Sequence, residues 1–339
     1  MNRDNIHNIL VTRLRFMGDI ILTIPLLDAL RQNYPRARIS YLAESPYLSL
    51  LEDHPGVDTL LEIDRKNFAR TVPVYVKLAA GAYDLAIDLF GNPRSALLTR
   101  LSRARIRIGG DFRGRRHFYS HTVNNNQKKL NAIQFHLSYL EPLAIRFRTI
   151  DPYINITPQE KAWAQEYLQR RGFRVNEKII GIHPGASWPA KRWFPNRFAV
   201  LANRLVSRAK SQILFTMGPG EEQILESTLK SCTFTLIQPK VLTLRQLAAV
   251  LSQVDVFISN DCGPMHLAPA VGTPTIGLFG PGEPEIWFPY PRDLGHRFIH
   301  HDMDCSRCRR DFCDNPVCMQ TITVDEVYDT AVDILRTWG

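Results

Sequence analysis

The 339-residue chain contains no long apolar run. A membrane-spanning helix needs about 18 to 20 consecutive apolar residues, and no stretch of this sequence reaches that length. The N-terminus also lacks the apolar core of a secretory signal, because Asn2–Asn8 is polar and the short run Ile9–Val11 is soon followed by Arg13. These absences exclude helical membrane spans and predict a soluble cytoplasmic protein, long enough for two domains with hydrophobic cores.

Acidic residues are scarce in the first half of the chain. Residues 1–150 hold 22 Lys and Arg against 13 Asp and Glu, so they carry the whole net charge of +9, while the remainder holds 20 of each. Between Arg94 and Arg116 there are eight arginines and one acid, Asp111. Such a stretch is typical of a solvated face or of a nucleic-acid site. Its arginines are interleaved with apolar residues, which favours an anionic acceptor or an anionic membrane surface over nucleic acid.

The rest of the chain is organised around residues 254–287. Val254–Ser259 predicts a buried strand, the apolar periodicity after Gly263 predicts a helix, and Thr275–Phe279 predicts the next strand. In such a βαβ unit, ligands bind beyond the carboxyl ends of the strands, and a helix N-terminus favours a phosphate. Residues 261–265 are therefore predicted to hold a phosphate, although an Asp at such a position is also a common helix N-cap.

Residues 261–274 read DCGPMHLAPAVGTP, and LFGP and Trp287 follow. This run resembles the C-terminal signature of glycosyltransferase family 9, the ADP-heptose:lipopolysaccharide heptosyltransferases. Two further motifs match the same family in the expected order, so the resemblance covers nearly the whole chain. It implies that the donor is held at this stretch, by Asp261, Cys262, Gly263 and His266.

The first further motif follows the predicted strand Asn8–Thr12. Gly18 and Asp19, with Pro25 beyond them, resemble the segment in which the family's aspartate is the catalytic base. The resemblance thus implies that Asp19 deprotonates the acceptor hydroxyl, with Gly18 at the substrate beside it. The residues alone also allow Asp19 to be only the cap of a helix predicted for Asp19–Asn33, a common role for Asp at such a position. The two roles can coexist, because an acceptor hydroxyl needs only a positioned carboxylate.

The second further motif follows a predicted strand that ends at His183. Ser187 and Lys191 match the family's segment in which the lysine contacts the donor phosphates, although a surface lysine is usually only solvated. Glu221 comes directly after another predicted strand, a position suited to binding a ribose diol, and the family has such a glutamate there. The resemblance also implies that Leu242 approaches the adenine, mainly through its backbone.

Strands and helices alternate along the whole chain, which predicts an α/β fold with parallel, doubly wound sheets. The resemblance implies the GT-B architecture, in which two Rossmann-like domains face a central cleft. A capping box at Thr157–Glu160 starts a helix near the domain junction. We therefore predict an acceptor-binding domain at residues 1–155 and a nucleotide-sugar-binding domain with a cysteine-rich tail at residues 156–339.

Four of the six cysteines lie together in the tail, at Cys305, Cys308, Cys313 and Cys318. A cytoplasmic chain keeps its thiols reduced, so disulfides are disfavoured. Four close thiolates suit a closed tetrahedral zinc site, although the spacing is not the commonest one. The sequence leaves a structural zinc and free thiols open as alternatives.

The resemblance implies an inverting transferase that moves a heptose from ADP-heptose to the Kdo or heptose of the lipid A core oligosaccharide, at the cytoplasmic surface of the inner membrane. Catalysis in the family needs no metal or other cofactor. Arg113, Arg115 and Arg116 are the candidates for binding the anionic acceptor. Three alternatives remain: a family 9 transferase with another sugar donor, a nucleotide-sugar 2-epimerase of the same architecture, and a binding module with a degenerate site, which the intact motifs disfavour.

Overall fold

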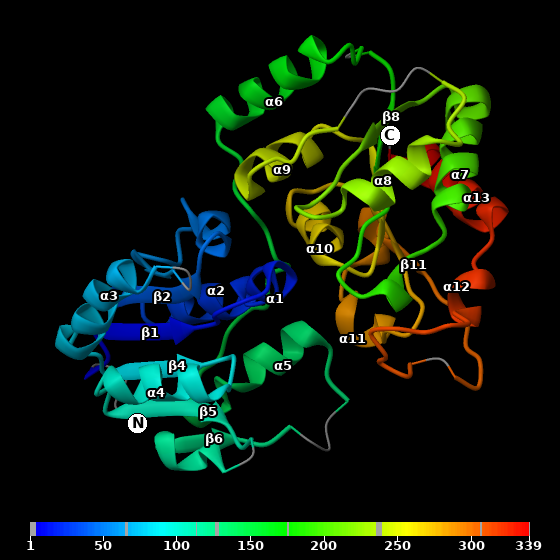
Figure 1. Cartoon of the computed structure of the whole chain (residues 1–339). Coiled ribbons are helices and arrows are strands. Elements are labelled where there is room, and N and C mark those ends of the chain that lie inside the picture. Colours follow the sequence, from blue (N-terminus) through cyan, green and yellow to red (C-terminus); the bar gives the residue numbers. More distant parts are fainter. Residues whose placement is uncertain are drawn as a thin grey trace. The chain divides into compact units, whose positions relative to one another are not determined.

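The computed structural model of the protein describes residues 5–64, 67–112, 114–125, 129–174, 176–234, 239–305 and 307–338. The chain separates into two compact units, Met1–Asn155 and Ile156–Gly339. Each unit is a parallel sheet with helices packed on it (Figure 1). Within the described residues, no helix is both long enough and apolar enough to cross a membrane.

The N-terminal unit is built on a six-stranded parallel sheet of order β3-β2-β1-β4-β5-β6. Its strands are β1 (Asn8–Thr12), β2 (Arg38–Glu44), β3 (Thr59–Ile63), β4 (Leu85–Asp88), β5 (Ile106–Gly110) and β6 (His121–Val123). Its helices are α1 (Met17–Ile21), α2 (Ile24–Asn33), η2 (Tyr47–Leu51), α3 (Phe68–Ala80), α4 (Pro93–Leu101), η3 (Arg115–Phe118), α5 (Ala132–Ser138) and η4 (Glu141–Leu143). The strand order reverses between β1 and β4, and such a switch point is where open α/β sheets bind ligands.

The C-terminal unit is built on a five-stranded parallel sheet of order β11-β10-β9-β7-β8. Its strands are β7 (Ile179–His183), β8 (Gln212–Phe215), β9 (Val256–Asn260), β10 (Thr275–Leu278) and β11 (Arg297–Ile299). Its helices are α6 (Pro158–Arg170), η5 (Pro189–Lys191), α7 (Pro195–Ala209), α8 (Glu222–Leu229), α9 (Leu244–Leu251), α10 (Gly263–Ala270), α11 (Pro284–Trp287), η6 (Arg292–Leu294), α12 (Val317–Gln320) and α13 (Val324–Trp338). The switch point lies between β7 and β9.

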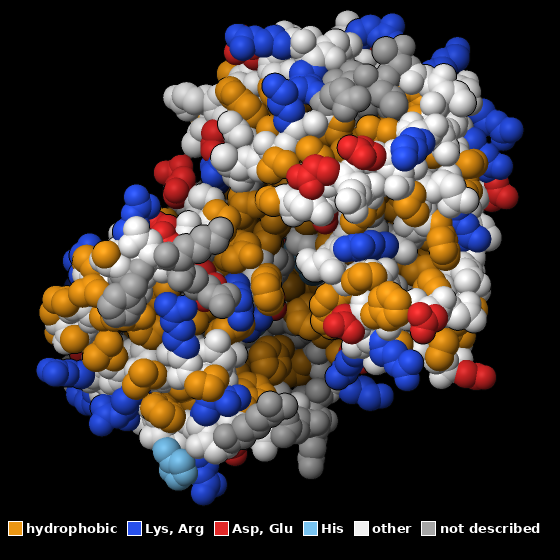
Figure 2. Space-filling view, viewed as in Figure 1, with side chains coloured by type: hydrophobic (Ala, Val, Ile, Leu, Met, Phe, Trp, Pro, Cys, Tyr) orange, Lys and Arg blue, Asp and Glu red, His pale blue; other side chains and the backbone are white. Residues whose placement is uncertain are grey.

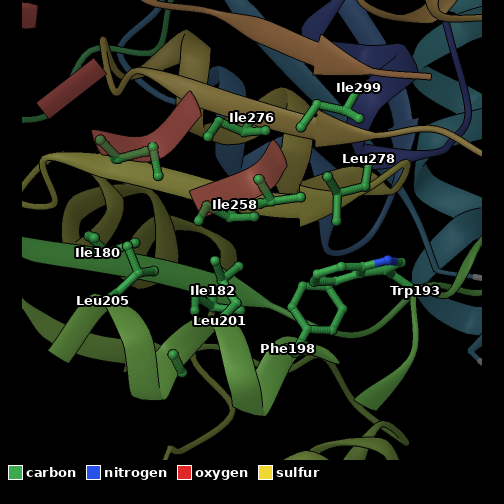
Figure 3. Close-up of a cluster of buried hydrophobic side chains, with 14 of the residues drawn as sticks. Ile180, Ile182, Trp193, Phe198, Leu201, Leu205, Ile258, Ile276, Leu278 and Ile299 are labelled. Carbon is green, nitrogen blue, oxygen red and sulfur yellow. The ribbon is translucent and has the colours of Figure 1, made fainter. Parts of the chain in front are cut away.

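The core of the C-terminal unit fixes the strands that carry its candidate site. Isoleucines of the sheet, such as Ile182 and Ile258, face Phe198 and Leu201 of α7 across a fully buried layer (Figure 3). Trp193 closes one end of this layer; it is fully buried, and its Nε1 donates to the Ile322 carbonyl at 3.1 Å. The two sheets and their cores confirm the predicted α/β fold with two Rossmann-like domains.

One predicted helix is wrong in detail. Asp19–Asn33 is not a single helix, because α1 already begins at Met17 and ends at Ile21, before α2 starts at Ile24. Pro25 has no N–H to donate to the turn before it, so the helical hydrogen-bond ladder cannot run through this point. Thr23 makes the junction, with its hydroxyl donating to the Ile20 carbonyl at 2.7 Å. Asp19 therefore lies in the first turn of α1 and is not its N-cap.

Candidate functional site

The residues predicted to bind the donor follow the carboxyl ends of three neighbouring strands of the C-terminal sheet. Lys191 lies in η5 after β7, Glu221 is the N-cap of α8 after β8, and Asp261 follows β9. Because parallel strands end at the same edge of a sheet, these side chains come from one edge, at the switch between β7 and β9. The fold thus brings the second and third sequence motifs together.

Asn260, the fully buried last residue of β9, holds the loop that follows β7. Its side-chain Oδ1 accepts from the Trp193 backbone N–H at 3.0 Å, and its Nδ2 donates to the carbonyls of Pro184 at 2.9 Å and Gly185 at 3.3 Å. Both ends of the loop that carries Lys191 are therefore tied to β9. Sequence reasoning missed this role, although Asn260 precedes Asp261 directly.

Lys191 and Asp261 form an ion pair in the site. The distance from Lys191 Nζ to Asp261 Oδ2 is 2.6 Å, with the two side chains 19% and 6% exposed. The ammonium also lies 4.7 Å from the centre of the Trp188 ring, a favourable cation–π position. A Cβ on Gly282 would come within 2.6 Å of Asp261 Oδ2, so only glycine leaves room for this carboxylate. Asp261 thus positions the lysine cation beside the end of β9.

The N-terminus of α10 adds hydrogen-bond donors beside this cation. Its N-cap, Cys262, makes no side-chain capping bond. Within the described residues, the backbone N–H groups of Cys262 and Gly263 donate to no protein acceptor, and Pro264 has no N–H. Free N–H groups and the helix dipole favour an anion at this position. Together with Lys191 they form a site suited to phosphate.

Glu221 is held by a buried histidine that sequence reasoning did not assign to the site. Its Oε2 lies 3.2 Å from His183 Nε2 and accepts from the Gly218 N–H at 2.6 Å. Burial lowers the pKa of His183, but the charges and hydrogen bonds of Cys262 and Glu221 raise it to about 10. Burial raises the pKa of Glu221, while His183 and the Gly218 N–H lower it to a net value below the ordinary one. Glu221 is therefore a carboxylate paired with an imidazolium.

The backbone makes space for this carboxylate. A Cβ on Gly185 would come within 2.2 Å of the Glu221 carboxyl group, so a side chain there would displace it. Gly185 is one of the residues whose carbonyl Asn260 holds. The glycine of the second motif is thus explained by the close approach of Glu221.

The other predicted donor residues lie at different places in the same unit. His266 is buried in α10, with its Nδ1 2.9 Å from the Tyr290 hydroxyl. Ser187 is exposed in the loop after β7, and Leu242 is half-buried just before α9. Their contacts with a nucleotide sugar stay predictions.

In the N-terminal unit, Asp19 has two partners. One carboxylate oxygen is ion-paired with Arg13, and the other accepts from the Phe16 backbone N–H at 3.1 Å. Arg13 follows β1, donates to the Leu89 carbonyl at 2.6 Å and lies over the ring of Phe90 at 5.0 Å. Asp19 is thus fixed at the switch point between β1 and β4. Gly18 is buried beside it in α1.

The predicted acceptor arginines lie beyond the end of β5. Arg113 lies outside the described residues, whereas Arg115 is half-buried and Arg116 exposed in η3. On the face drawn in Figure 2, Lys and Arg side chains gather over the N-terminal unit with few Asp and Glu among them. This distribution agrees with the excess of basic residues in the first 150 positions.

The four tail cysteines are free thiols that differ in exposure. Cys318 is buried, Cys313 half-buried, and Cys305 and Cys308 are exposed. Burial raises the pKa of the Cys318 thiol, and the charges of Cys305 and Cys308 raise it further. Among the described residues, which include all four cysteines, no group of three or more His, Cys, Asp or Glu side chains has a geometry that could hold a metal ion. The four thiols are not gathered into a tetrahedral site in this structure, and the structural zinc stays a prediction that the protein's metal content would test.

Comparisons with known proteins show which proteins the chain is similar to. Residues 74–317 match the family model for glycosyltransferase family 9 (heptosyltransferase). The chain is 28% identical over 300 residues to lipopolysaccharide heptosyltransferase 3 of Escherichia coli, covering 83% of this chain and 86% of that protein. Two solved structures are similar over almost their whole length: a family 9 glycosyl transferase from Veillonella parvula, with a TM-score of 0.88, 25% identity and 97% of each chain covered, and the E. coli ADP-heptose lps heptosyltransferase II, with a TM-score of 0.81, 20% identity and coverage of 97% and 98%.

Proposed function

The chain belongs to glycosyltransferase family 9, the heptosyltransferases, and from this premise we propose that it transfers a heptose from ADP-heptose to the inner core of lipopolysaccharide. The two E. coli relatives named above are lipopolysaccharide heptosyltransferases, and the name of one of them includes ADP-heptose, which supports both the donor and the acceptor class. In this proposal, the C-terminal unit binds ADP-heptose, and the basic N-terminal unit binds the lipid A core oligosaccharide.

The proposal rests on one observation. At the β7–β9 switch, the Lys191 cation, the free N–H groups at the start of α10 and the Glu221 carboxylate lie at one sheet edge. A cation and N–H groups match a diphosphate, and a carboxylate after a strand matches a ribose diol. This combination suits a nucleoside diphosphate sugar better than a free sugar or a phosphate alone.

The proposed reaction is a direct displacement that inverts the anomeric carbon. Asp19 takes the proton of the acceptor hydroxyl, whose oxygen forms a bond to the anomeric carbon of the heptose while the bond to the diphosphate oxygen breaks. Arg13 and the Phe16 N–H hold Asp19 in position for this step. Lys191 and the N–H groups of Cys262 and Gly263 stabilise the charge that develops on the departing ADP. We propose that no bound metal takes part, because these groups already supply positive charge to the phosphates.

The lipid A portion of the acceptor resides in a bilayer, so we further propose that the enzyme works at the cytoplasmic surface of the inner membrane. An acceptor panel tests the function as a whole. Purified enzyme, ADP-heptose and a set of truncated core lipopolysaccharides are incubated with and without EDTA, and mass spectrometry follows the products. A mass gain of one heptose on one acceptor, unchanged by EDTA, is expected. ADP-sugar exchange without any acceptor would favour an epimerase instead.

A further inference from the structure

A pocket of about 710 Å³ lies in the N-terminal unit, at the carboxyl ends of β4 and β5. It is lined by residues 90–93, which precede and start α4, and by Asp111, Phe112 and Arg115, which follow β5. Phe90 connects it to the candidate base, because Arg13 lies over the Phe90 ring and is ion-paired with Asp19. The pocket is therefore linked through Phe90 and Arg13 to the group that is proposed to activate the acceptor.

Two glycines let an aromatic ring form one side of this pocket. A Cβ on Gly91 would come within 2.8 Å of the Phe112 ring, and one on Gly110 within 2.2 Å. Gly91 also has a φ of +65°, which side chains rarely adopt. The ring of Phe112 thus packs directly on the backbone of both strand ends, and its remaining surface lines the pocket. Aromatic surface of this kind binds the apolar C–H face of a sugar ring.

A fully buried carboxylate fixes the pocket wall. Asp88, the last residue of β4, accepts hydrogen bonds from the backbone N–H groups of Phe90 and Gly91, both at 3.0 Å. It also accepts from the hydroxyls of Ser95 at 2.8 Å and Tyr119 at 2.7 Å. Two of these four bonds hold the loop from β4 to α4, and the other two join the end of β4 to α4 and to the residue after η3. A wall held in this way is preorganised, so less ordering is needed when a ligand binds.

The pocket lining carries one cation that could pair with an anionic group. Within the described residues, neither Arg15, which lies over the Phe90 ring at 5.9 Å, nor Arg115 has an ion pair. The Nε of Arg115 is shielded from solvent and has no hydrogen-bond partner there. Asp111 is the one carboxylate among the described residues that line the pocket. Of the lining side chains, Arg115 thus offers a cation for an anionic group and Asp111 a carboxylate suited to sugar hydroxyls, while Arg15 adds positive charge beside Phe90 without lining the pocket.

We propose that this pocket binds an acceptor sugar residue that carries a carboxylate or a phosphate, with Phe112 packed against the ring and Arg115 paired with the anionic group. The inference rests on the proposed glycosyl transfer. It narrows the predicted acceptor site from a broad basic surface to one pocket. It makes Phe112 and Arg115 acceptor-binding residues that leave the donor site untouched. Arg105, an exposed arginine at the opposite, amino end of β5, provides a matched control.

The experiment compares Arg115→Gln, Phe112→Leu and Arg105→Gln in the full-length enzyme. The acceptor is deacylated core oligosaccharide, used intact and after chemical removal of its phosphates. We expect Arg115→Gln to raise the acceptor KM about tenfold, as loss of one charge-assisted bond implies, and Phe112→Leu to raise it about threefold. Arg105→Gln and the KM for ADP-heptose should stay within twofold of the wild type.

The two acceptor forms identify the anion. If Arg115→Gln raises KM only for the phosphorylated form, the partner is a phosphate; if it raises KM equally for both forms, the partner is a sugar carboxylate. Calorimetric titration of the intact oligosaccharide into wild type and Arg115→Gln gives a readout that does not depend on transfer. Equal binding to both proteins would overturn the subsite. If the wild type binds the oligosaccharide but transfers no heptose to it, the proposed reaction would be wrong while the proposed subsite would be retained.

Discussion

The Nε2 of His183 lies 3.2 Å from the Oε2 of Glu221, and the Nδ1 of the same ring lies 3.0 Å from the Thr216 hydroxyl oxygen. The Thr216 hydroxyl is placed to donate to the Ile182 carbonyl, at 3.5 Å, which leaves its lone pair to accept from the imidazole. Both ring nitrogens therefore face acceptors, as an imidazolium requires. The histidine at the end of β7 thus orients the carboxylate proposed to hold the ribose.

A first prediction concerns stability at alkaline pH. The pKa of His183 is raised from 6.5 to about 10, so the protonated form is favoured by folding. Its contribution is fully present below pH 6.5 and is lost as the pH rises towards 10. We expect the melting temperature of the wild type to fall over this interval more steeply than that of His183→Gln, which keeps an N–H for Glu221 but cannot gain a proton. Parallel melting curves from pH 6 to 10 would contradict a charged His183.

The same variant gives a prediction for the ligand. If His183 orients Glu221 toward a ribose diol, His183→Gln should weaken ADP binding by about 1 to 1.5 kcal/mol, because a neutral amide replaces the charged donor to Glu221. The variant should also lose part of the discrimination between ADP and 2′-deoxy-ADP. Calorimetry with both nucleotides measures this. A lower affinity with unchanged discrimination would mean that His183 has only a structural role.

Replacement of the candidate base is expected to separate catalysis from donor binding. Asp19→Asn keeps the size of the side chain but cannot take a proton from the acceptor hydroxyl. Loss of a general base typically lowers the rate by 10²- to 10⁴-fold, and we expect kcat to fall by this amount. ADP affinity should be nearly unchanged, because the residues proposed to bind the donor belong to the other unit. Turnover of Asp19→Asn at the wild-type rate would remove Asp19 from its role.

Lys191→Ala should weaken donor binding and slow transfer. The lysine is expected to make a charge-assisted contact with the diphosphate, worth roughly 1.5 to 3 kcal/mol. Its removal also leaves the buried Asp261 without its partner, so the double variant Lys191→Ala/Asp261→Asn separates that cost from the lost contact. Lys178, which is 47% exposed and paired with Asp255, serves as the control lysine. A KM for ADP-heptose and a kcat like those of Lys178→Ala would exclude Lys191 from the site.

Local signals in the sequence were enough to predict most of the helices and strands that carry these residues. The capping box at Thr157–Glu160 starts α6 as predicted, with the Thr157 hydroxyl accepting from the Glu160 N–H at 3.2 Å. The strand endings before Lys191 and Asp261 were also predictable, because apolar runs end there in glycine and polar residues. In contrast, α3 was missed: Pro73 and several valines lie within Phe68–Ala80, and these residues disfavour a helix unless packing supports it.

The partners within the site could not be predicted, because they come from distant parts of the chain. The Asn260 side chain bonds to residues that precede it in the chain by 67 to 76 positions. His183 pairs with Glu221, which follows it by 38 positions. Such pairs exist only once the parallel strands are in register. Arg13 is only six residues from Asp19, but sequence periodicity carries no signal for an ion pair that depends on a loop and a short helix. Motifs therefore indicated candidate side chains, and the fold shows which of them lie together and how they are held.

The cysteine-rich tail gives a prediction about metal content. A zinc held by Cys305, Cys308, Cys313 and Cys318 would require the exposed cysteines to close around Cys318, since the described side chains do not form a metal site. Elemental analysis of protein purified without chelators decides between the alternatives. About one zinc per chain, with a melting temperature that falls on chelation, would support the structural zinc. Protein without metal whose thiols all react with an alkylating reagent after unfolding would support free thiols.

The excess of positive charge in the N-terminal unit should act on the acceptor and not on the donor. Exposed charges interact over about a Debye length, roughly 8 Å at physiological salt, so added salt should raise the KM for a phosphorylated acceptor. The donor phosphates are expected to meet Lys191, which is largely buried with Asp261, where screening is weaker. The variant Arg115→Glu/Arg116→Glu should therefore raise the acceptor KM and flatten its dependence on salt, while the donor KM stays within about twofold.

The control Arg208→Glu/Lys210→Glu, exposed at the end of α7, changes net charge by the same amount in the other unit and should leave acceptor kinetics unchanged. If both double variants raised the acceptor KM equally, the effect would come from net charge alone; if the first lowered donor affinity, the assignment of the two substrates to separate units would be wrong.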